Sequence, residues 1–228
     1  MTSLQPIAED LWLLNYPMGL AGMQIGRNVT VIRLRDGRLV IHSTAPFAPE
    51  DIAAIKALGQ PAWLVDATLF HDSFAKEGRR AFDGLPYLAP PGFPKVSGIA
   101  TEVLDPPPEA WAGEIEVLLL EGMKANEHVF FHCASRTLIV CDLFFNFGPN
   151  VSGWTRWSAR QLMRLPDGMG MSVLFRLLIR DRAAFGRSLR RMMEWDFERL
   201  IVGHGEVIPS DAKRVVARLS GRAGFDVG

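Results

Sequence analysis

The sequence predicts an α/β protein in which two β-sheets lie between layers of helices. Short apolar runs separated by turn residues fill the first half of the chain and indicate strands, with Asp36-Gly37 as a hairpin turn between two of them. From Trp154 onward the apolar residues recur with helical spacing. One more apolar strand, Leu200–Val202, then runs into Gly203-His204-Gly205. This order of strands and helices is typical of sheets covered by helices on both sides.

In the first half, β-branched and aromatic runs bounded by turn signals predict strands. The segment Pro49–Leu58 begins with a proline and acidic residues and stops before Gly59, as an α-helix does. The proline-rich runs 89–94 and 106–108 are expected to be rigid loops. The expected strands are 10–15, 28–34, 38–42, 63–65, 87–88, 115–121 and 127–132, and a second helix is expected at 73–82.

In the second half, Cys133–Arg136 is expected to be the turn of a hairpin that continues into a strand at 137–142. In this register Thr137 faces His132, and Asp142 faces Glu127. Helices are expected at 155–165, 173–179, 181–195 and 210–219, with Ser210 as the N-cap of the last, and a strand is expected at 200–202.

Composition limits the classes of function. The chain has 228 residues, of which 48% are hydrophobic, and we expect one domain spanning 1–228. Its 25 basic and 25 acidic residues balance, which argues against a general nucleic-acid or membrane-surface binder but leaves local patches open. No signal peptide or membrane span is recognisable, and Cys133 and Cys141 fit no disulfide framework. A cytoplasmic protein that binds a small-molecule substrate or ligand is therefore expected, and its oligomeric state is not predicted.

The segment Arg176–Arg199 carries seven arginines, with apolar residues between them at helical spacing. The simplest interpretation is an amphipathic helix with a solvated face. An anionic partner or ligand is the alternative.

Three polar residues lie where predicted strands end: His71, Asp142 and His204. Loops at strand ends carry the sites of α/β folds, and two imidazoles with a carboxylate are suitable ligands for a metal ion. The competing interpretation is a pair of hydrogen-bonded histidines and an aspartate that caps a turn. Further candidates for lining the same cleft are His42, Asp72, Glu127 and Asn146.

The remaining histidines and cysteines are expected to be structural. His128 and His132 point to the same side of one strand, and the hairpin register places His132 far from Asp142 along the sheet. Cys141 lies in an apolar strand without a neighbouring cation in the sequence, which favours an inert buried thiol over a nucleophile.

With His71, Asp142 and His204 in this order, and with the closing segment LIVGHGEVIP, the chain resembles the metallo-β-lactamase superfamily over nearly its whole length. The resemblance implies an αββα sandwich with a site at one edge between the sheets. It also implies a degenerate, uncharacterised branch that lacks the HxHxDH motif, because the corresponding segment reads Thr68-Leu69-Phe70-His71-Asp72-Ser73-Phe74. Three of seven metal ligands match: His71, Asp142 and His204.

Two alignments of the His71 segment remain open. If Thr68 matches the threonine that commonly precedes the motif, His71 belongs to one metal position and His204 to the other, and neither ion has three protein ligands. If His71 is instead the last histidine of the motif, the three residues surround one ion.

The resemblance implies two main functions. The first is a hydrolase with a reduced site that holds one zinc, iron or manganese ion. The second is a protein without metal that binds a small molecule or a protein in the old cleft, and acid–base catalysis without metal is a third option. In the second case aromatic side chains would line the cleft: Phe70, Phe74, Phe93, Phe144, Phe145 and Trp154.

Overall fold

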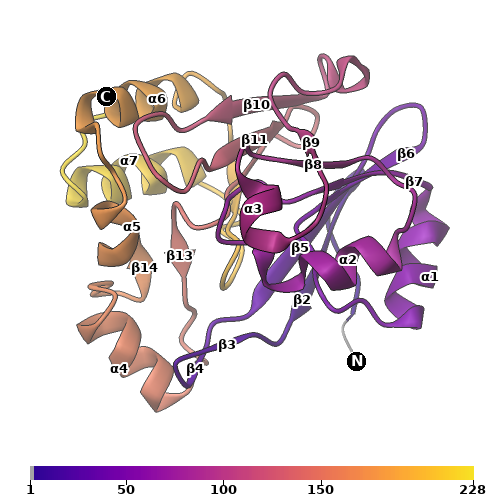
Figure 1. Cartoon of the computed structure of the whole chain (residues 1–228). Helices are drawn as coiled ribbons and strands as arrows, with labels where there is room; N and C mark the ends of the chain where they lie inside the picture. The colour runs from indigo at the N-terminus through magenta and orange to yellow at the C-terminus, as the bar shows by residue number, and fades with distance from the viewer. Residues whose placement is uncertain (1–2) are drawn as a thin grey trace.

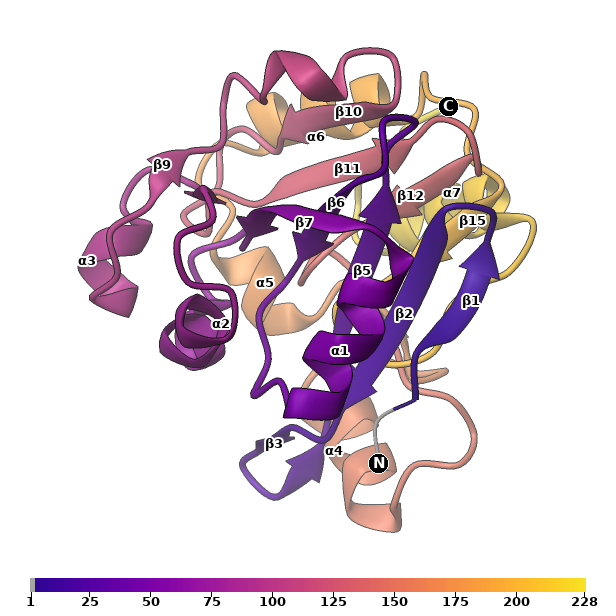
Figure 2. The ribbon, with the colours of Figure 1, turned by 90° about the vertical axis from the view of Figure 1, so that its right-hand side faces the viewer.

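The computed structural model describes residues 3–228, which form two mixed sheets packed face to face between helices (Figure 1). The larger sheet has seven strands in the order β1-β2-β5-β6-β7-β8-β9, and the smaller has four in the order β10-β11-β12-β15. Figure 2 shows α1 and α2 on the outer face of the larger sheet, while α6 and α7 lie behind the smaller one. The predicted arrangement of two sheets between helical layers is confirmed.

The larger sheet is antiparallel from β1 to β6 and parallel from β6 to β9, and in the smaller sheet only β12 and β15 are parallel. Two short pairs, β3-β4 and β13-β14, complete the strands. The strand bounds are β1 Gln5–Ala8, β2 Leu11–Tyr16, β3 Gly19–Leu20, β4 Met23–Gln24, β5 Arg27–Arg33, β6 Arg38–His42, β7 Gln60–Val65, β8 Tyr87–Ala89, β9 Glu102–Val103, β10 Ile115–Leu119, β11 His128–His132, β12 Thr137–Ile139, β13 Phe145–Asn146, β14 Met169–Gly170 and β15 Arg199–Ile201.

Capping side chains set the first residue of two of the helices. Ser152 caps α4 with its hydroxyl and Asp181 caps α6 with its carboxylate, so each helix starts directly after its cap. The helix bounds are α1 Pro49–Leu58, α2 Ala75–Ala81, α3 Phe93–Ser97, α4 Gly153–Gln161, α5 Val173–Leu177, α6 Arg182–Met192 and α7 Ala212–Arg222, with 3₁₀ turns η1 Asp72–Phe74 and η2 Glu109–Trp111. None of the described helices is long and apolar enough to cross a bilayer.

Three local predictions are wrong. The strand predicted at 137–142 ends at Ile139. The last helix starts at Ala212 after Asp211, which has a left-handed backbone (φ 55°) and no capping side-chain bond, so Ser210 is not its N-cap. The proline-rich run 89–94 is not loop throughout, because α3 begins at Phe93 after the left-handed Gly92.

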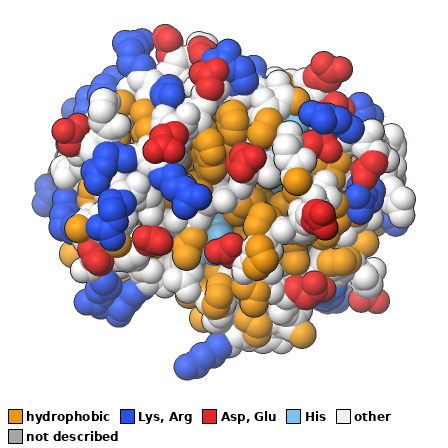
Figure 3. Space-filling view, turned by 90° about the horizontal axis from the view of Figure 1, so that it is seen from above, with side chains coloured by type: hydrophobic (Ala, Val, Ile, Leu, Met, Phe, Trp, Pro, Cys, Tyr) orange, Lys and Arg blue, Asp and Glu red, His pale blue; other side chains and the backbone are white. Residues whose placement is uncertain are grey.

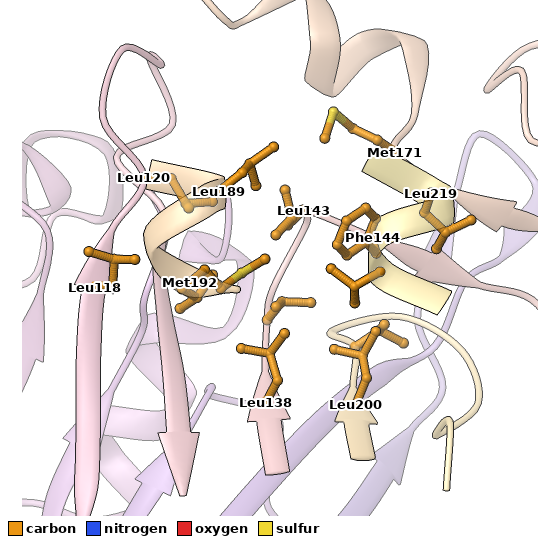
Figure 4. Packing of buried hydrophobic residues seen from close by; sticks show 14 of the residues in the cluster. Leu118, Leu120, Leu138, Leu143, Phe144, Met171, Leu189, Met192, Leu200 and Leu219 are labelled. Atoms are coloured by element: carbon orange, nitrogen blue, oxygen red, sulfur yellow. The ribbon is translucent and has the colours of Figure 1, made fainter. Parts of the chain in front are cut away.

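Apolar side chains fill three interlayer spaces. Residues such as Ile32 and Phe130 meet between the two sheets, and others such as Val31 and Ile55 lie beneath α1 and α2. The largest cluster lies between the smaller sheet and the C-terminal helices, where Leu138 and Leu200 of the parallel pair face Leu189 and Met192 (Figure 4). Because β12 and β15 are almost wholly buried, the polar side chains that follow their ends are held in defined positions.

Candidate metal centre

His71, Asp142 and His204 come together at the edge between the two sheets. Each offers one ligand atom, and these atoms all lie within 4.8 Å of one another. Asp142 Oδ1 is 3.3 Å from His204 Nε2 and 3.7 Å from His71 Nε2. The three residues follow β7, β12 and β15, so the parallel pairing of β12 with β15 sets Asp142 beside His204. The three ligand atoms are therefore close enough to one another to hold a metal ion.

Hydrogen bonds on the far side of each imidazole fix the ring orientation. His204 Nδ1 donates to the carbonyl oxygen of Gly26 at 2.5 Å, which directs the Nε2 atom at Asp142. His71 Nδ1 shares a hydrogen bond of 3.1 Å with the hydroxyl of Ser43, and its Nε2 has no hydrogen-bond partner among the described residues. Bonds of this kind position the histidines of metal sites.

The glycines around His204 are required by close backbone contacts. A Cβ at Gly205, where φ is +108°, would lie 2.0 Å from the carbonyl oxygen of Asn146. A Cβ at Gly203 would lie 2.7 Å from the carbonyl oxygen of Cys141, which accepts the Gly203 N–H. Asn28 completes the attachment, because its side-chain amide donates to the carbonyls of Val202 and Gly205. The Gly-His-Gly sequence therefore lets the His204 loop pack directly on its neighbours.

The turn that carries Asp142 wraps around the buried carboxylate of Glu127. Glu127 accepts three backbone N–H bonds, from Cys141 at 2.9 Å and from Asp142 and Leu143 at 3.1 Å. The β12 strand ends at Ile139 because the following N–H groups turn toward this carboxylate. The structure confirms the predicted hairpin register, since His132 pairs with Thr137 and Glu127 contacts the Asp142 segment.

Electrostatics keep His71 in the unprotonated form. Burial, reinforced by the positive charge of Arg27, lowers the pKa of His71 to about 3, although Asp142 acts in the opposite direction. Burial opposes ionisation of Asp142 as well, but His71 and His204 hold its pKa below the usual range. At neutral pH the site thus contains an unprotonated His71 and an ionised Asp142, the states in which these residues bind metals.

Arg27 is the important residue that the sequence did not reveal. Its side chain is fully buried, and none of its three nitrogens has a hydrogen-bond partner among the described residues. The guanidinium carbon lies 5.9 Å from the ring centre of Phe74, and the charge also acts on His42, His71 and Asp66. Arg27 is the first residue of β5 and directly follows Gly26, which accepts the hydrogen bond from His204.

The other cleft candidates are distributed around the three ligands. His42 is buried at the end of β6, with its ring 4.7 Å from that of Phe130, and burial lowers its pKa to about 4. Asp72 is half-buried at the start of η1, and Glu127 is fully buried. Asn146 forms the wall of a cavity of about 530 Å³.

The aromatic candidates divide between core and surface. Phe145 stacks on the His204 ring at 5.4 Å, whereas Phe93 and Phe144 are core residues. Phe70 and Trp154 are about half exposed, at 48% and 51%. Cys141 is fully buried, and burial raises the pKa of its thiol well above the usual value, in keeping with the inert thiol expected from the sequence.

A groove of about 590 Å³ runs beside the site. Gly26, Asn28 and Gly205, which hold His204 in place, contribute to its walls. The ligand side chains themselves are nearly enclosed, with exposed fractions of 1% for His71, 5% for His204 and 13% for Asp142. The groove therefore borders the residues that surround His204, and the three ligand side chains do not line it.

Solved structures show what the fold resembles, although no protein-family model and no curated protein sequence matches the chain. The crystal structure of VMB-1 at pH 5.5 superposes with a TM-score of 0.69 at 13% identity, over 98% of both chains. A metallo-β-lactamase from Pontibacter korlensis gives 0.65 at 11% identity, over 98% of this chain and 99% of the other. FIM-1 from Pseudomonas aeruginosa in its mono-zinc form gives 0.65 at 12% identity, over 97% and 96%. The chain therefore has the metallo-β-lactamase fold, with two mixed sheets and flanking helices.

Proposed function

We propose that the protein is a hydrolase that uses one metal ion held by His71, Asp142 and His204. The observation that carries this proposal is the convergence of three ligand atoms from three separate strand ends within 4.8 Å. Two imidazole nitrogens and a carboxylate oxygen suit zinc, iron or manganese. When bound, such an ion polarises carbonyl or phosphoryl oxygens and lowers the pKa of a water molecule at an open position.

Hydrogen bonds from surrounding residues hold these ligands in position. Gly26 and Ser43 hold the two imidazoles by their Nδ1 atoms, and Glu127 holds the backbone of the Asp142 turn. The fixed positive charge of Arg27 keeps His71 unprotonated and opposes a second cation nearby. These features support a site for one ion rather than two. The mono-zinc form of FIM-1 is a precedent within the same fold.

The groove beside His204 supports a small-molecule substrate. Its walls combine apolar side chains such as Leu13 and Ile25 with polar groups such as Asn15 and Gln24. A mainly apolar concave surface with a few polar groups is typical of small-molecule sites. We propose esters, thioesters, amides or phosphodiesters as the substrate classes, because water activated by a metal ion attacks each of them.

The test is hydrolysis by protein from which metal has been removed and then restored. Stripped protein, and protein reloaded with zinc, iron or manganese, would be assayed against model esters, thioesters and phosphodiesters. We expect activity only after reloading, and only with His204 intact. Activity that stripped protein retains in full, or that His204→Ala retains, would contradict the proposal.

A metal-free binding protein is the second candidate, and the near enclosure of the three ligands favours it. Their low exposure leaves little room for a substrate at the ion, whereas the 590 Å³ groove is open. In this case the imidazoles would fix polar groups of a ligand, and no added metal would change its binding.

A further inference from the structure

Exposed apolar side chains gather on the β3-β4 hairpin, α4 and α5. Nine large apolar side chains of residues 3–228 are clearly exposed, and six of them belong to the β3-β4 hairpin, α4, α5 and the residue after α4. Their exposed fractions run from 50% to 70%. The six are Leu20, Trp154, Trp157, Leu162, Leu174 and Leu177.

Direct contacts join these elements into one surface. Trp154 Nε1 donates to the carbonyl of Ala21 at 3.2 Å, which attaches α4 to the β3-β4 hairpin. The rings of Trp154 and Trp157 stack at 5.2 Å. At the other end of α4, the N–H of Val173 donates to the carbonyl of Met163 at 3.0 Å, so α5 starts beside the end of α4. In Figure 1 both helices lie along the left side of the molecule.

The segment that carries α4 and α5, and continues through α6, is strongly basic although the whole chain is neutral. Residues 150–193 contain nine arginines and two aspartates, with no lysine or glutamate. Asp167 is paired with Arg222 and Asp181 caps α6, while none of the nine arginines forms an ion pair within the described chain. Figure 3, which looks down on the molecule from above, shows many basic side chains on its left, with acidic ones among them. The nine are Arg156, Arg160, Arg164, Arg176, Arg180, Arg182, Arg187, Arg190 and Arg191.

We propose that this surface, here called the α4–α5 face, binds the headgroup region of an anionic membrane. Exposed tryptophan and leucine suit the boundary between headgroups and acyl chains, and unpaired arginines are attracted to anionic lipids. The positive charge that would attract anionic lipid is confined to this part of the chain, because the chain as a whole has equal numbers of basic and acidic residues. A nucleic-acid interface fits less well, because such interfaces are polar, whereas Leu174 and Leu177 expose 63% and 70% of their surface here.

A basic cavity at the edge of the face fits a lipid phosphate. The cavity has a volume of about 390 Å³ and is lined by three arginines, Arg164, Arg176 and Arg222. It is also lined by Asp167, whose carboxylate is paired with Arg222 at 2.7 Å. The Nε of Arg176 is buried and has no hydrogen-bond partner among the described residues. An arginine nitrogen in this state is suited to a phosphate oxygen.

Sedimentation with vesicles tests the proposal. The full chain would be mixed with vesicles of phosphatidylcholine alone, and with vesicles in which about one third of the lipid is phosphatidylglycerol. We expect binding only to the anionic vesicles, weakened by high salt, with a blue shift of tryptophan fluorescence. Both Trp154→Ala/Trp157→Ala and Arg160→Glu/Arg164→Glu should bind about tenfold or more weakly, because each changes two exposed side chains in or directly after α4.

Matched substitutions elsewhere provide the control. Val103 and Arg80 are comparably exposed, at 54% and 75%, but lie outside the α4–α5 face, so Val103→Ala and Arg80→Glu should bind vesicles as the wild type does. The proposal is overturned if anionic vesicles are not bound at low salt, or if the control variants lose binding equally. Tighter binding to duplex DNA than to anionic vesicles would also overturn it and identify a nucleic-acid interface.

Discussion

Replacing His204 with alanine is expected to weaken metal binding by more than about 100-fold, because it removes one of three ligands and even residues behind the ligands contribute 10–100-fold. The variant should remain folded. It loses one hydrogen bond to Gly26 and the stacking of Phe145, contacts at the edge of the core. The measurement is zinc affinity by competition with a chromophoric chelator, together with urea unfolding.

His132→Ala is the matched control for this variant. His132 is as buried as the site histidines and also makes one side-chain hydrogen bond, to Ser135 at 2.7 Å. It lies at the far end of the hairpin from Asp142, so its removal should cost stability without changing zinc affinity. Equal loss of zinc affinity in both variants would show that destabilisation, and not the loss of a ligand, is the cause.

Glu127→Ala is expected to lower the free energy of unfolding by about 3–5 kcal/mol, because it leaves three buried N–H groups without an acceptor. The Asp142 turn would lose its support, so zinc affinity should fall as well. Urea unfolding and zinc competition measure the two effects.

Glu127→Gln is the matched control for Glu127→Ala, because it keeps the size and shape of the side chain. Burial and the charge of Asp142 raise the pKa of Glu127 to about 8, against the effect of the three N–H bonds, so a neutral side chain of the same shape is tolerated at pH 7. One carbonyl oxygen remains to accept from the turn, and we expect a loss of about 1–2 kcal/mol. An alanine variant as stable as the glutamine variant would contradict the role assigned to this carboxylate.

The sequence predicted those elements whose signals are local. The helix Pro49–Leu58 and the strand Arg38–His42 have the predicted bounds, because a proline start, a following Gly59 and an Asp-Gly turn act within a few residues. The hairpin register follows from its short turn in the same way. The last helix was mispredicted because Ser210 is a good cap in isolation, whereas the chain enters that helix through a left-handed Asp211.

The site was predicted only in part. His71, Asp142 and His204 stand out because each follows an apolar strand, but their convergence depends on the packing of two sheets. Arg27 could not have been identified, since a lone arginine beside an apolar strand is normally at the surface and nothing local indicates that this one is buried. The roles of Ser43 and Gly26 could not be predicted either, because the histidines that they contact are far away in the sequence.

The metal content and coordination of untagged protein test the central claim most directly. After loading with zinc, iron or manganese, mass spectrometry and X-ray absorption would give the stoichiometry and the ligand atoms. We predict about one ion per chain, bound by two imidazole nitrogens and a carboxylate oxygen at about 2.0–2.2 Å for zinc. Protein that takes up no ion under any of these conditions, or an ion bound through sulfur, would contradict a centre formed by His71, Asp142 and His204.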